Sequence, residues 1–320
     1  MPEFPSKVQV PESLSGQRLD VVLAEMFPDY SRSRLKQWIQ EGQVLLEGQQ
    51  VKPKIKVFTD QELQLNIAPI ESNEECLPED IPLDIAYEDD ALIVVNKPAG
   101  LVVHPAAGNR QGTLQNALLF YDERLATVPR AGIVHRLDKD TTGLMVVARN
   151  LVSHKYLVEQ IMQRQMQREY QALVHGVLTG GGTVDQPIGR HSHDRVRMTV
   201  REDGKPAVSH YRVLARFRAH THIHVKLETG RTHQIRVHMQ HLRHPVVGDP
   251  IYVDRPRIPA EADKDFVERL RKMERQALHA WRLSLAHPDT GEAMTWEAAL
   301  PDDMQCLIAA MQKDLETHGK

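Results

Sequence analysis

The segment GIVHRLDKDTTGLMVVAR at residues 132–149 places two carboxylates and three cations between two apolar runs. Arg136 and Lys139 lie beside Asp138 in the chain and favour its ionised form. An ionised carboxylate can act as a nucleophile, a general base or an electrostatic stabiliser, and attack on a sugar carbon is one such reaction. Glycosidases usually add a second carboxylic acid, for which Asp140 is the candidate, although we expect one carboxylate to do the covalent work. The alternative is a solvated turn between two strands.

A second polar cluster stands at the start of a predicted helix within residues 227–252, LETGRTHQIRVHMQHLRHPVVGDPIY. Its members follow a predicted strand directly; they are Arg231, Thr232, His233, Gln234 and Arg236. Helix N-termini and arginines both favour a phosphate or a carboxylate partner. The alternative is an exposed helix end. Because polar groups are concentrated here between apolar stretches, we expect a site.

Other features suggest ligand sites more weakly. The histidines that would share a face are His220, His222 and His224 on a strand, and His238 and His241 on a helix. Since no His-Glu-x-x-His pattern and no cysteine pair accompanies them, we expect no metal or other cofactor, and a polar or RNA-facing strand instead. The glycines of TGGGTVD at 179–185 lack the Lys-Ser/Thr ending of a phosphate loop and are typical of a turn.

The elements that would position these residues are mostly strands from residue 83 onward. Short turns join many of them and few helices interrupt them, without a regular βαβ repeat. This pattern predicts an α+β fold with a mixed, mostly antiparallel sheet in a catalytic domain over 83–320. The segments RQALHAWRLSLAHP and AMTWEAAL predict a final hairpin, and DDMQCLIAAMQKDLETH a terminal amphipathic helix.

Residues 16–75 form a predicted unit of their own, with α/β character. RLDVVLAEMF and SRSRLKQWIQEG have helical spacing, Ser31 is a predicted N-cap, and a hairpin turn is predicted at Glu47-Gly48. The second helix carries Arg32, Arg34 and Lys36. Cations on one side of a compact unit are typical of a nucleic-acid platform, although a solvated face is the alternative.

A proline-rich acidic stretch separates the two predicted domains. Residues 70–90 hold nine acids and no Lys or Arg, and we interpret 69–82 as a linker and 76–90 as an acidic linker segment. Residues 186–218 hold eight Lys or Arg against three acids, so the net charge of −3 masks basic regions.

The length of 320 residues suggests two domains, and the composition suggests a cytoplasmic protein. Cys76 and Cys306, the only cysteines, exclude a disulfide framework and fit a reducing compartment. No signal peptide and no membrane-spanning apolar run is visible in the sequence.

Four segments of the second predicted domain resemble the motifs of a known family. HRLDKDTTGLMVVAR, REYQALVHG, LETGRTHQIRVH and QALHAWRLSLAHP are similar to the successive motifs of the pseudouridine synthases that act on ribosomal RNA. Residues 16–68 resemble the S4-type RNA-binding domain that precedes many of these enzymes. The resemblance covers nearly the whole chain, in the family's order.

The resemblance implies that Asp138 attacks the target nucleoside at C1′, or assists formation of a glycal, and that the uracil is re-attached through C5. Tyr170 would stack on the uracil and help to remove the C5 proton, and Arg231 would pair with Asp138. Arg136 would enter the RNA stack when the base flips out. His135 and Leu278 would complete the substrate site. No cofactor is implied.

The implied partner is large-subunit (23S) ribosomal RNA, either free or within the ribosomal particle, with target uridines in the helix 69 stem-loop. We expect a monomer. Three alternatives remain. The first is the same reaction on another ribosomal or transfer RNA. The second is a non-catalytic RNA-binding assembly factor, which predicts binding without a modified nucleoside. The third is an unrelated carboxylate hydrolase, which predicts release of free base or sugar.

Overall fold

The chain divides into two compact units, residues 1–75 and 76–320. The computed structural model describes residues 7–27, 32–66, 76–106, 108–194, 196–253 and 255–319, without the side chains of residues 32–34. Within these ranges, no helix combines the length and hydrophobicity that are needed to cross a lipid bilayer.

The first unit packs two helices against a four-stranded sheet. Its elements are β1 (Lys7–Gln9), η1 (Glu12–Leu14), α1 (Leu19–Met26), α2 (Arg32–Gln40), β2 (Val44–Leu46), β3 (Gln49–Gln50) and β4 (Glu62–Leu65), with strand order β1-β4-β2-β3. Leu23 and Trp38 from the two helices are buried in its apolar core. The predicted hairpin turn is confirmed, because Glu47 and Gly48 take φ of +50° and +76° between β2 and β3. Ser31, the predicted N-cap, lies outside the described residues.

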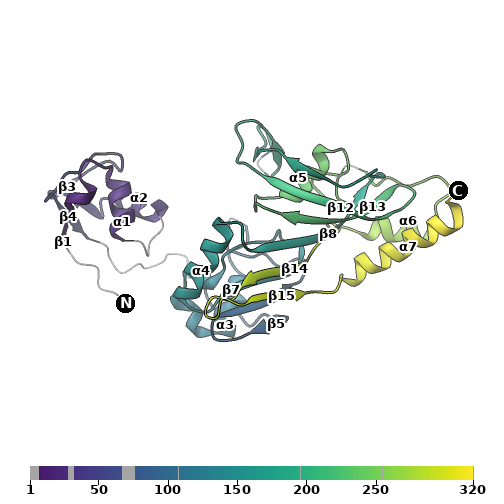
Figure 1. Ribbon diagram of the computed structural model, residues 1–320, viewed down its shortest axis with the longest axis horizontal. Helices are drawn as coiled ribbons and strands as arrows, with labels where there is room; N and C mark the ends of the chain where they lie inside the picture. Colours follow the sequence, from purple (N-terminus) through teal and green to yellow (C-terminus); the bar gives the residue numbers. More distant parts are fainter. Residues whose placement is uncertain are drawn as a thin grey trace. The chain divides into compact units, whose positions relative to one another are not determined.

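A nine-stranded sheet organises the second unit (Figure 1). Its path is β5 (Ile85–Glu88), β6 (Leu92–Lys97), β7 (Thr142–Ala148), β14 (Leu278–Ala286), β8 (Gln167–His175), β13 (His220–Leu227), β12 (Val208–Arg216) and β9 (Gly182–Asp185), and β15 (Ala293–Glu297) also pairs with β14. Only the β7–β14 pair among the described strands of this sheet is parallel. This arrangement confirms the predicted α+β fold and its mostly antiparallel sheet.

Helices cover parts of this sheet and a small second sheet stands beside it. The further elements are α3 (Leu114–Tyr121), η2 (Glu123–Thr127), η3 (Pro129–Gly132), α4 (Leu151–Met162), β10 (Ile188–Arg190), β11 (Met198–Val200), α5 (Gln234–His241), α6 (Lys264–Lys272) and α7 (Asp302–His318). Figure 1 shows α6 and α7 side by side at the C-terminal end, where Phe266 and Leu307 are buried in the main core. The predicted final hairpin and terminal helix correspond to β14, β15 and α7.

Residues 76–90 do not form the linker that their acidity suggests. The backbone of Glu79 donates to the carbonyl of Asn116, and the Asn116 amide donates to the carbonyl of Leu77. The Glu79 carboxylate accepts from the backbone N–H of Gly112. From residue 85 the segment is β5, a strand of the main sheet. Glu79 and Asp89 are half-buried and bonded, the other acids of the segment are exposed, and the backbone is bonded to the rest of the second unit.

Two apolar segments of the strand-rich second unit are not strands. Residues 101–105 make turns with one bridge, from Val102 to Thr113, and residues 132–137 make one bridge, from Ile133 to Val147. The chain is held there by side chains and turns. The segment that carries Asp138 is therefore an irregular approach to β7 and not half of a hairpin.

The histidines of β13 share one face, as predicted, but that face is buried and does not point to RNA. His220 is 0% exposed and His222 is 9% exposed. His220 packs against His175 and Phe266. Burial lowers the pKa of His220 to about 3 and that of His222 to about 4, so both rings are neutral at pH 7.

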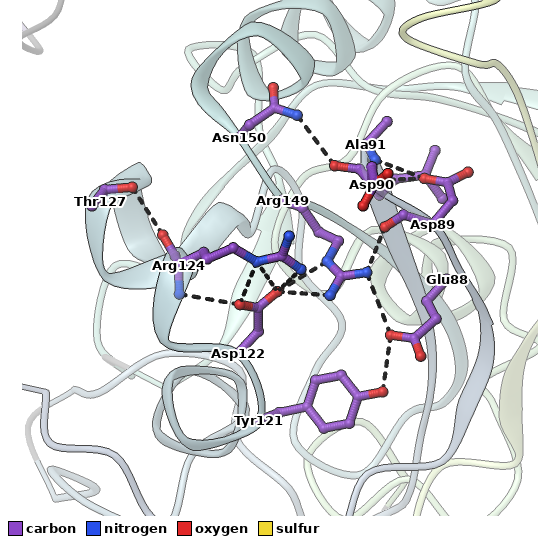
Figure 2. Close-up of polar contacts among 11 residues, drawn as sticks. Glu88, Asp89, Asp90, Ala91, Tyr121, Asp122, Arg124, Thr127, Arg149 and Asn150 are labelled. Carbon is purple, nitrogen blue, oxygen red and sulfur yellow. Dashed lines mark hydrogen bonds and ion pairs between the residues drawn. The ribbon is translucent and has the colours of Figure 1, made fainter.

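An ion-pair cluster fixes the end of β7 to the turn after α3 (Figure 2). Asp122 accepts hydrogen bonds from the side chains of Arg124 and Arg149 and from the backbone N–H of Arg124. Arg149 also donates to the carbonyl of Asp89 and lies 3.6 Å from Glu88. The side-chain hydrogen bonds of Arg124, reinforced by Arg149 and opposed by burial, lower the pKa of Asp122 to about 2.

Candidate active site

Asp138 lies in the irregular segment that leads into β7, and its partner is Arg236 on α5. Nη1 of Arg236 donates to Oδ2 of Asp138 over 2.9 Å. The Asp138 side chain keeps 17% of its exposure, whereas the Arg236 side chain keeps 3%. Within the described chain, Oδ1 of Asp138 accepts no side-chain hydrogen bond. One carboxylate oxygen is thus fixed and the other is left for an incoming atom.

Arg236 is itself held by Asp249. Nε and Nη2 of Arg236 donate to the two carboxylate oxygens of Asp249 over 2.6 and 2.8 Å, a bidentate geometry that fixes the guanidinium plane. The Tyr252 ring covers the guanidinium at 5.2 Å. Burial works against the charge of Arg236, but the bonds and charge of Asp249, and then those of Asp138, raise its pKa. Arg236 therefore stays charged and aimed at Asp138.

The prediction that Arg231 pairs with Asp138 is wrong. Arg231 is exposed, and its Nε donates to the carbonyl of Pro206. The helix starts later than the sequence suggested, at Gln234, so Arg231 belongs to the preceding turn. Gln234 closes that turn by accepting from the Arg231 backbone N–H. Arg236, in the first turn of α5, takes the position in which Arg231 was expected.

The backbone that follows Asp138 is held from several sides. Lys97 is completely buried, and its Nζ donates to the carbonyls of Lys139, Pro98 and Leu101. Burial lowers the pKa of Lys97 to about 8, although the charges of Asp140 and Asp138 oppose the shift.

The segment before β14 supplies the other supports of this loop. Arg275 donates to the carbonyl of Asp140, and the Gln276 amide donates to Thr141 Oγ1 over 2.9 Å. Gly143, at φ +115°, lies so close to β14 that a Cβ would stand 2.2 Å from the Ala280 carbonyl oxygen. Only glycine fits there, and the loop is rigid on both sides of the carboxylate.

Tyr170 and Leu278 lie on the neighbouring strands β8 and β14 of the main sheet. Tyr170 is at the centre of β8 and 5% exposed, and Leu278, at the start of β14, is 4% exposed; both belong to the same apolar cluster as Leu137. Burial raises the pKa of Tyr170, with Arg168 opposing and Asp138 adding to the shift. An apolar floor with one phenol fits a flat uncharged base. The contacts of Tyr170 and Leu278 with substrate stay predictions.

His135 and Arg136 differ although they are adjacent. His135 Nε2 accepts from the Val146 backbone N–H, and burial lowers its pKa to about 3, so the ring is a neutral support of the loop. Arg136 is exposed and has no ion pair within the described ranges. Arg136, an exposed cation two residues before Asp138, fits the predicted insertion into RNA. Nε2 of His135 is already engaged with the backbone.

The three cations of the first unit that the sequence suggests for RNA binding lie on α2. Lys36 is exposed, and Arg32 and Arg34 are in the same helix, with side chains outside the described set. Their role in RNA binding stays a prediction.

Sequence reasoning missed Lys97 and Asp249, and it placed Arg236 in the polar cluster without pairing it with Asp138. The sequence held one indication of the role of Arg236. Its neighbours Ile235 and Val237 are apolar, and if the helix packs through both of them, Arg236 is buried between them. Asp249 gave no such signal, since only the fold brings it to α5.

Family models match parts of both units. A model described as RNA pseudouridylate synthase matches residues 91–241, which include Asp138, Tyr170 and Arg236, and a model described as S4 domain matches residues 17–62.

Curated relatives match over nearly the full length. The chain is 56% identical over 310 residues to ribosomal large subunit pseudouridine synthase D of Escherichia coli strain K12, covering 97% of this chain and 95% of the relative. It is 55% identical over 308 residues to the protein of the same name from Pseudomonas aeruginosa, covering 96% of each.

Two solved human structures share the fold of the second unit. RNA pseudouridylate synthase domain containing 4 superposes with a TM-score of 0.55 at 26% identity, covering 71% of this chain and 92% of that chain. RNA pseudouridylate synthase domain containing 1 gives a TM-score of 0.53 at 28% identity, with coverage of 72% and 87%.

Proposed function

Because this chain belongs to the RNA pseudouridine synthase family, we propose that it converts uridines of large-subunit ribosomal RNA to pseudouridine with Asp138 as the nucleophile. The names of the relatives support the substrate, and the S4-type unit supports RNA binding. The observation that carries the role of Asp138 is its ion pair with a buried, bidentately held Arg236, which leaves one carboxylate oxygen free.

The reaction follows from that geometry. The free oxygen of Asp138 forms a bond to C1′ while the C1′–N1 bond breaks, and the electron pair leaves with the uracil. In the alternative path the carboxylate takes the C2′ proton as the C1′–N1 bond breaks, which leaves a glycal, and the base departs in the same form. The uracil turns and C5 bonds to C1′, while the Asp138–C1′ ester bond breaks or, in the glycal path, C2′ regains its proton. The C5 proton is then removed with the help of Tyr170, and N1 gains a proton. Substrate and product are isomers, so no group donor enters.

Three further residues, Arg136, Leu278 and Tyr170, fit the flipping and holding of the base. Arg136, exposed and unpaired in the described structure, would fill the gap that the flipped nucleotide leaves, because unstacking a base costs a few kcal/mol that an inserted side chain recovers in part. Leu278 and Tyr170 would hold the uracil ring between apolar and aromatic surfaces.

The target would be uridines in the helix 69 stem-loop, where an unpaired loop makes flipping least costly. The cations of α2, Arg32, Arg34 and Lys36, would hold phosphates. A monomer in the cytoplasm, acting on free RNA or on the assembling particle, is the simplest form of this proposal.

The test is tritium release from transcribed large-subunit RNA that carries 5-tritiated uridine. Wild type should release tritium with the RNA chain intact, and Asp138→Asn should lose at least about 10³-fold in rate, because an amide cannot attack C1′. Asp140→Asn is the matched control in the same loop and should keep its activity.

Binding without release by wild type, from RNA and from particles, would instead support an RNA-binding assembly factor. Release of free uracil would support a hydrolase. Release by Asp138→Asn would remove Asp138 from the mechanism. Mapping the modified positions distinguishes the helix 69 loop from other targets.

A further inference from the structure

Arg168 is a buried cation without a partner beside the catalytic residues. It is 8% exposed on β8, and its Nε is shielded from solvent and makes no hydrogen bond. No ion pair, side-chain hydrogen bond or aromatic contact engages its guanidinium within the described part of the chain. Arg236, the other arginine of this site, spends all three donor nitrogens on carboxylates.

The strand register places Arg168 on the side of the sheet that carries Tyr170. The two residues are two apart on β8 and pair with Leu227 and Val225 of β13, so their side chains leave the same face. A Cβ on Gly230 would lie 2.6 Å from Nη1 of Arg168, so the guanidinium extends toward the turn before α5. The charge of Arg168 acts on both Tyr170 and His135.

A buried charge that nothing pairs is costly to a folded protein. Two other arginines of low exposure in the described chain, Arg149 and Arg236, are bonded to carboxylates. The backbone of Arg168 pairs with β13 and β14, but within the described chain its side chain makes no bond that would stabilise the fold. An unpaired donor set in a site that takes substrate is instead what a ligand oxygen requires.

We propose that Arg168 donates hydrogen bonds to a carbonyl oxygen of the target uracil and stabilises the base when it leaves. This inference rests on the proposed function and extends it. When the C1′–N1 bond breaks, the electron pair stays with the uracil, whose negative charge spreads over N1 and the two carbonyl oxygens. The charge forms in both the ester path and the glycal path, so the role of Arg168 is the same in each. A fixed cation placed where charge develops lowers the barrier.

The first test compares stability with rate for Arg168→Met and Arg168→Lys. Arg168→Met should keep or raise Tm, because it removes an unpaired buried charge, while kcat for tritium release falls roughly 10²-fold and RNA affinity is unchanged. Arg168→Lys should recover part of kcat. Arg282→Gln on neighbouring β14 is the matched control, with unchanged kcat. A lower Tm for Arg168→Met, or an unchanged kcat, would overturn the proposal.

A second variant reaches the same group without changing it. Gly230→Ala inserts a methyl group against Nη1 and should displace the guanidinium, lowering kcat in the wild-type background and having no further effect in Arg168→Met. Equal effects in both backgrounds would mean that Gly230 acts independently of Arg168.

Substrate analogues test whether Arg168 contacts a carbonyl oxygen of the base or an oxygen of the phosphate. With 4-thiouridine or 2-thiouridine at the target, one of the two should make Arg168→Met and wild type nearly equal, because sulfur is a weak acceptor. If a methylphosphonate at the target phosphate removes the difference instead, Arg168 binds the backbone and the uracil contact is wrong. If wild type releases no tritium from any RNA, the proposed function fails first; release by wild type and Arg168→Met at equal rates removes only this inference.

Discussion

The second unit holds two arginine–aspartate clusters. In one of them two arginines share one carboxylate, and in the other two carboxylates share one arginine. In the cluster of Figure 2, one carboxylate, Asp122, is shared by Arg124 and Arg149 and by a backbone N–H. In the active site, one guanidinium, Arg236, is shared by Asp249 and Asp138. Excess cations saturate Asp122, whereas excess carboxylates leave Asp138 with a single side-chain bond.

The difference shows how one kind of contact serves stability or chemistry. Asp122 holds η2 against the end of β7 and has no free lone pair directed to solvent for a reaction. Asp249 plays the corresponding part in the active site, because it also accepts from the backbone N–H groups of Ile251 and Tyr252. Asp138 is the carboxylate that the network orients without saturating.

The largest effect in this comparison should come from Arg236→Lys. Lysine keeps a charge but cannot span Asp249 and Asp138 with a planar fork, so kcat should fall roughly 10²-fold. Arg149→Lys is the same substitution in the other cluster and should leave kcat within about twofold. Steady-state tritium release measures both. Similar kcat values for the two variants would show that the bidentate geometry of Arg236 is not required.

Asp122→Asn should have the opposite profile, a loss of stability with normal turnover. The depressed pKa of about 2, against an ordinary value of 3.8, corresponds to about 2 kcal/mol of stability at pH 7. For a unit of this size that is roughly 4–8 °C in Tm, measured by thermal unfolding.

The same variant gives a pH test with a defined sign. A carboxyl group whose folded-state pKa is lowered contributes stability above its unfolded pKa and loses it as the pH falls. The Tm difference between wild type and Asp122→Asn should therefore be constant above about pH 5 and shrink from pH 3.8 toward pH 2. A constant difference throughout would mean that the Asp122 charge is not what stabilises the turn.

The smallest effect should come from Arg231→Gln. Within the described part of the chain this exposed side chain bonds only a backbone carbonyl, so kcat should stay within about twofold of wild type. The assay is again tritium release at saturating RNA. A loss as large as that of Arg236→Lys would restore Arg231 to the catalytic set.

The sequence was sufficient for the features that local chemistry or period defines. The charged segment around Asp138, the hairpin at Glu47-Gly48 and the strand-rich second unit were all predicted from residue types and spacing. The family resemblance implied that Arg231 pairs with Asp138. Arg236 lies in the same motif, and the start of α5 decides between the two arginines. His233, with φ of +56°, delays the helix until Gln234.

Contacts between distant segments could not be read from spacing. Lys97 lies next to Lys139 only because β6 pairs with β7. The acidic run at 76–90 has the composition of a linker, but its backbone bonds to Asn116 and the Glu79 carboxylate accepts from the backbone N–H of Gly112. Composition shows the charge of this segment but not the hydrogen bonds that its backbone makes.

The supports of the Asp138 loop also set an order for the assembly of this enzyme during synthesis. Gln276 bonds Thr141 across 135 residues of chain, and His279 bonds Thr142 across 137. Contacts of such long sequence separation form late, because the intervening chain must exist and close first. A nascent chain that ends before residue 275 carries Asp138, Tyr170 and Arg236 but lacks the strand that fixes their loop. The S4-type unit, with its short-range contacts, can fold much earlier. RNA binding capacity would therefore precede catalytic competence on the translating ribosome.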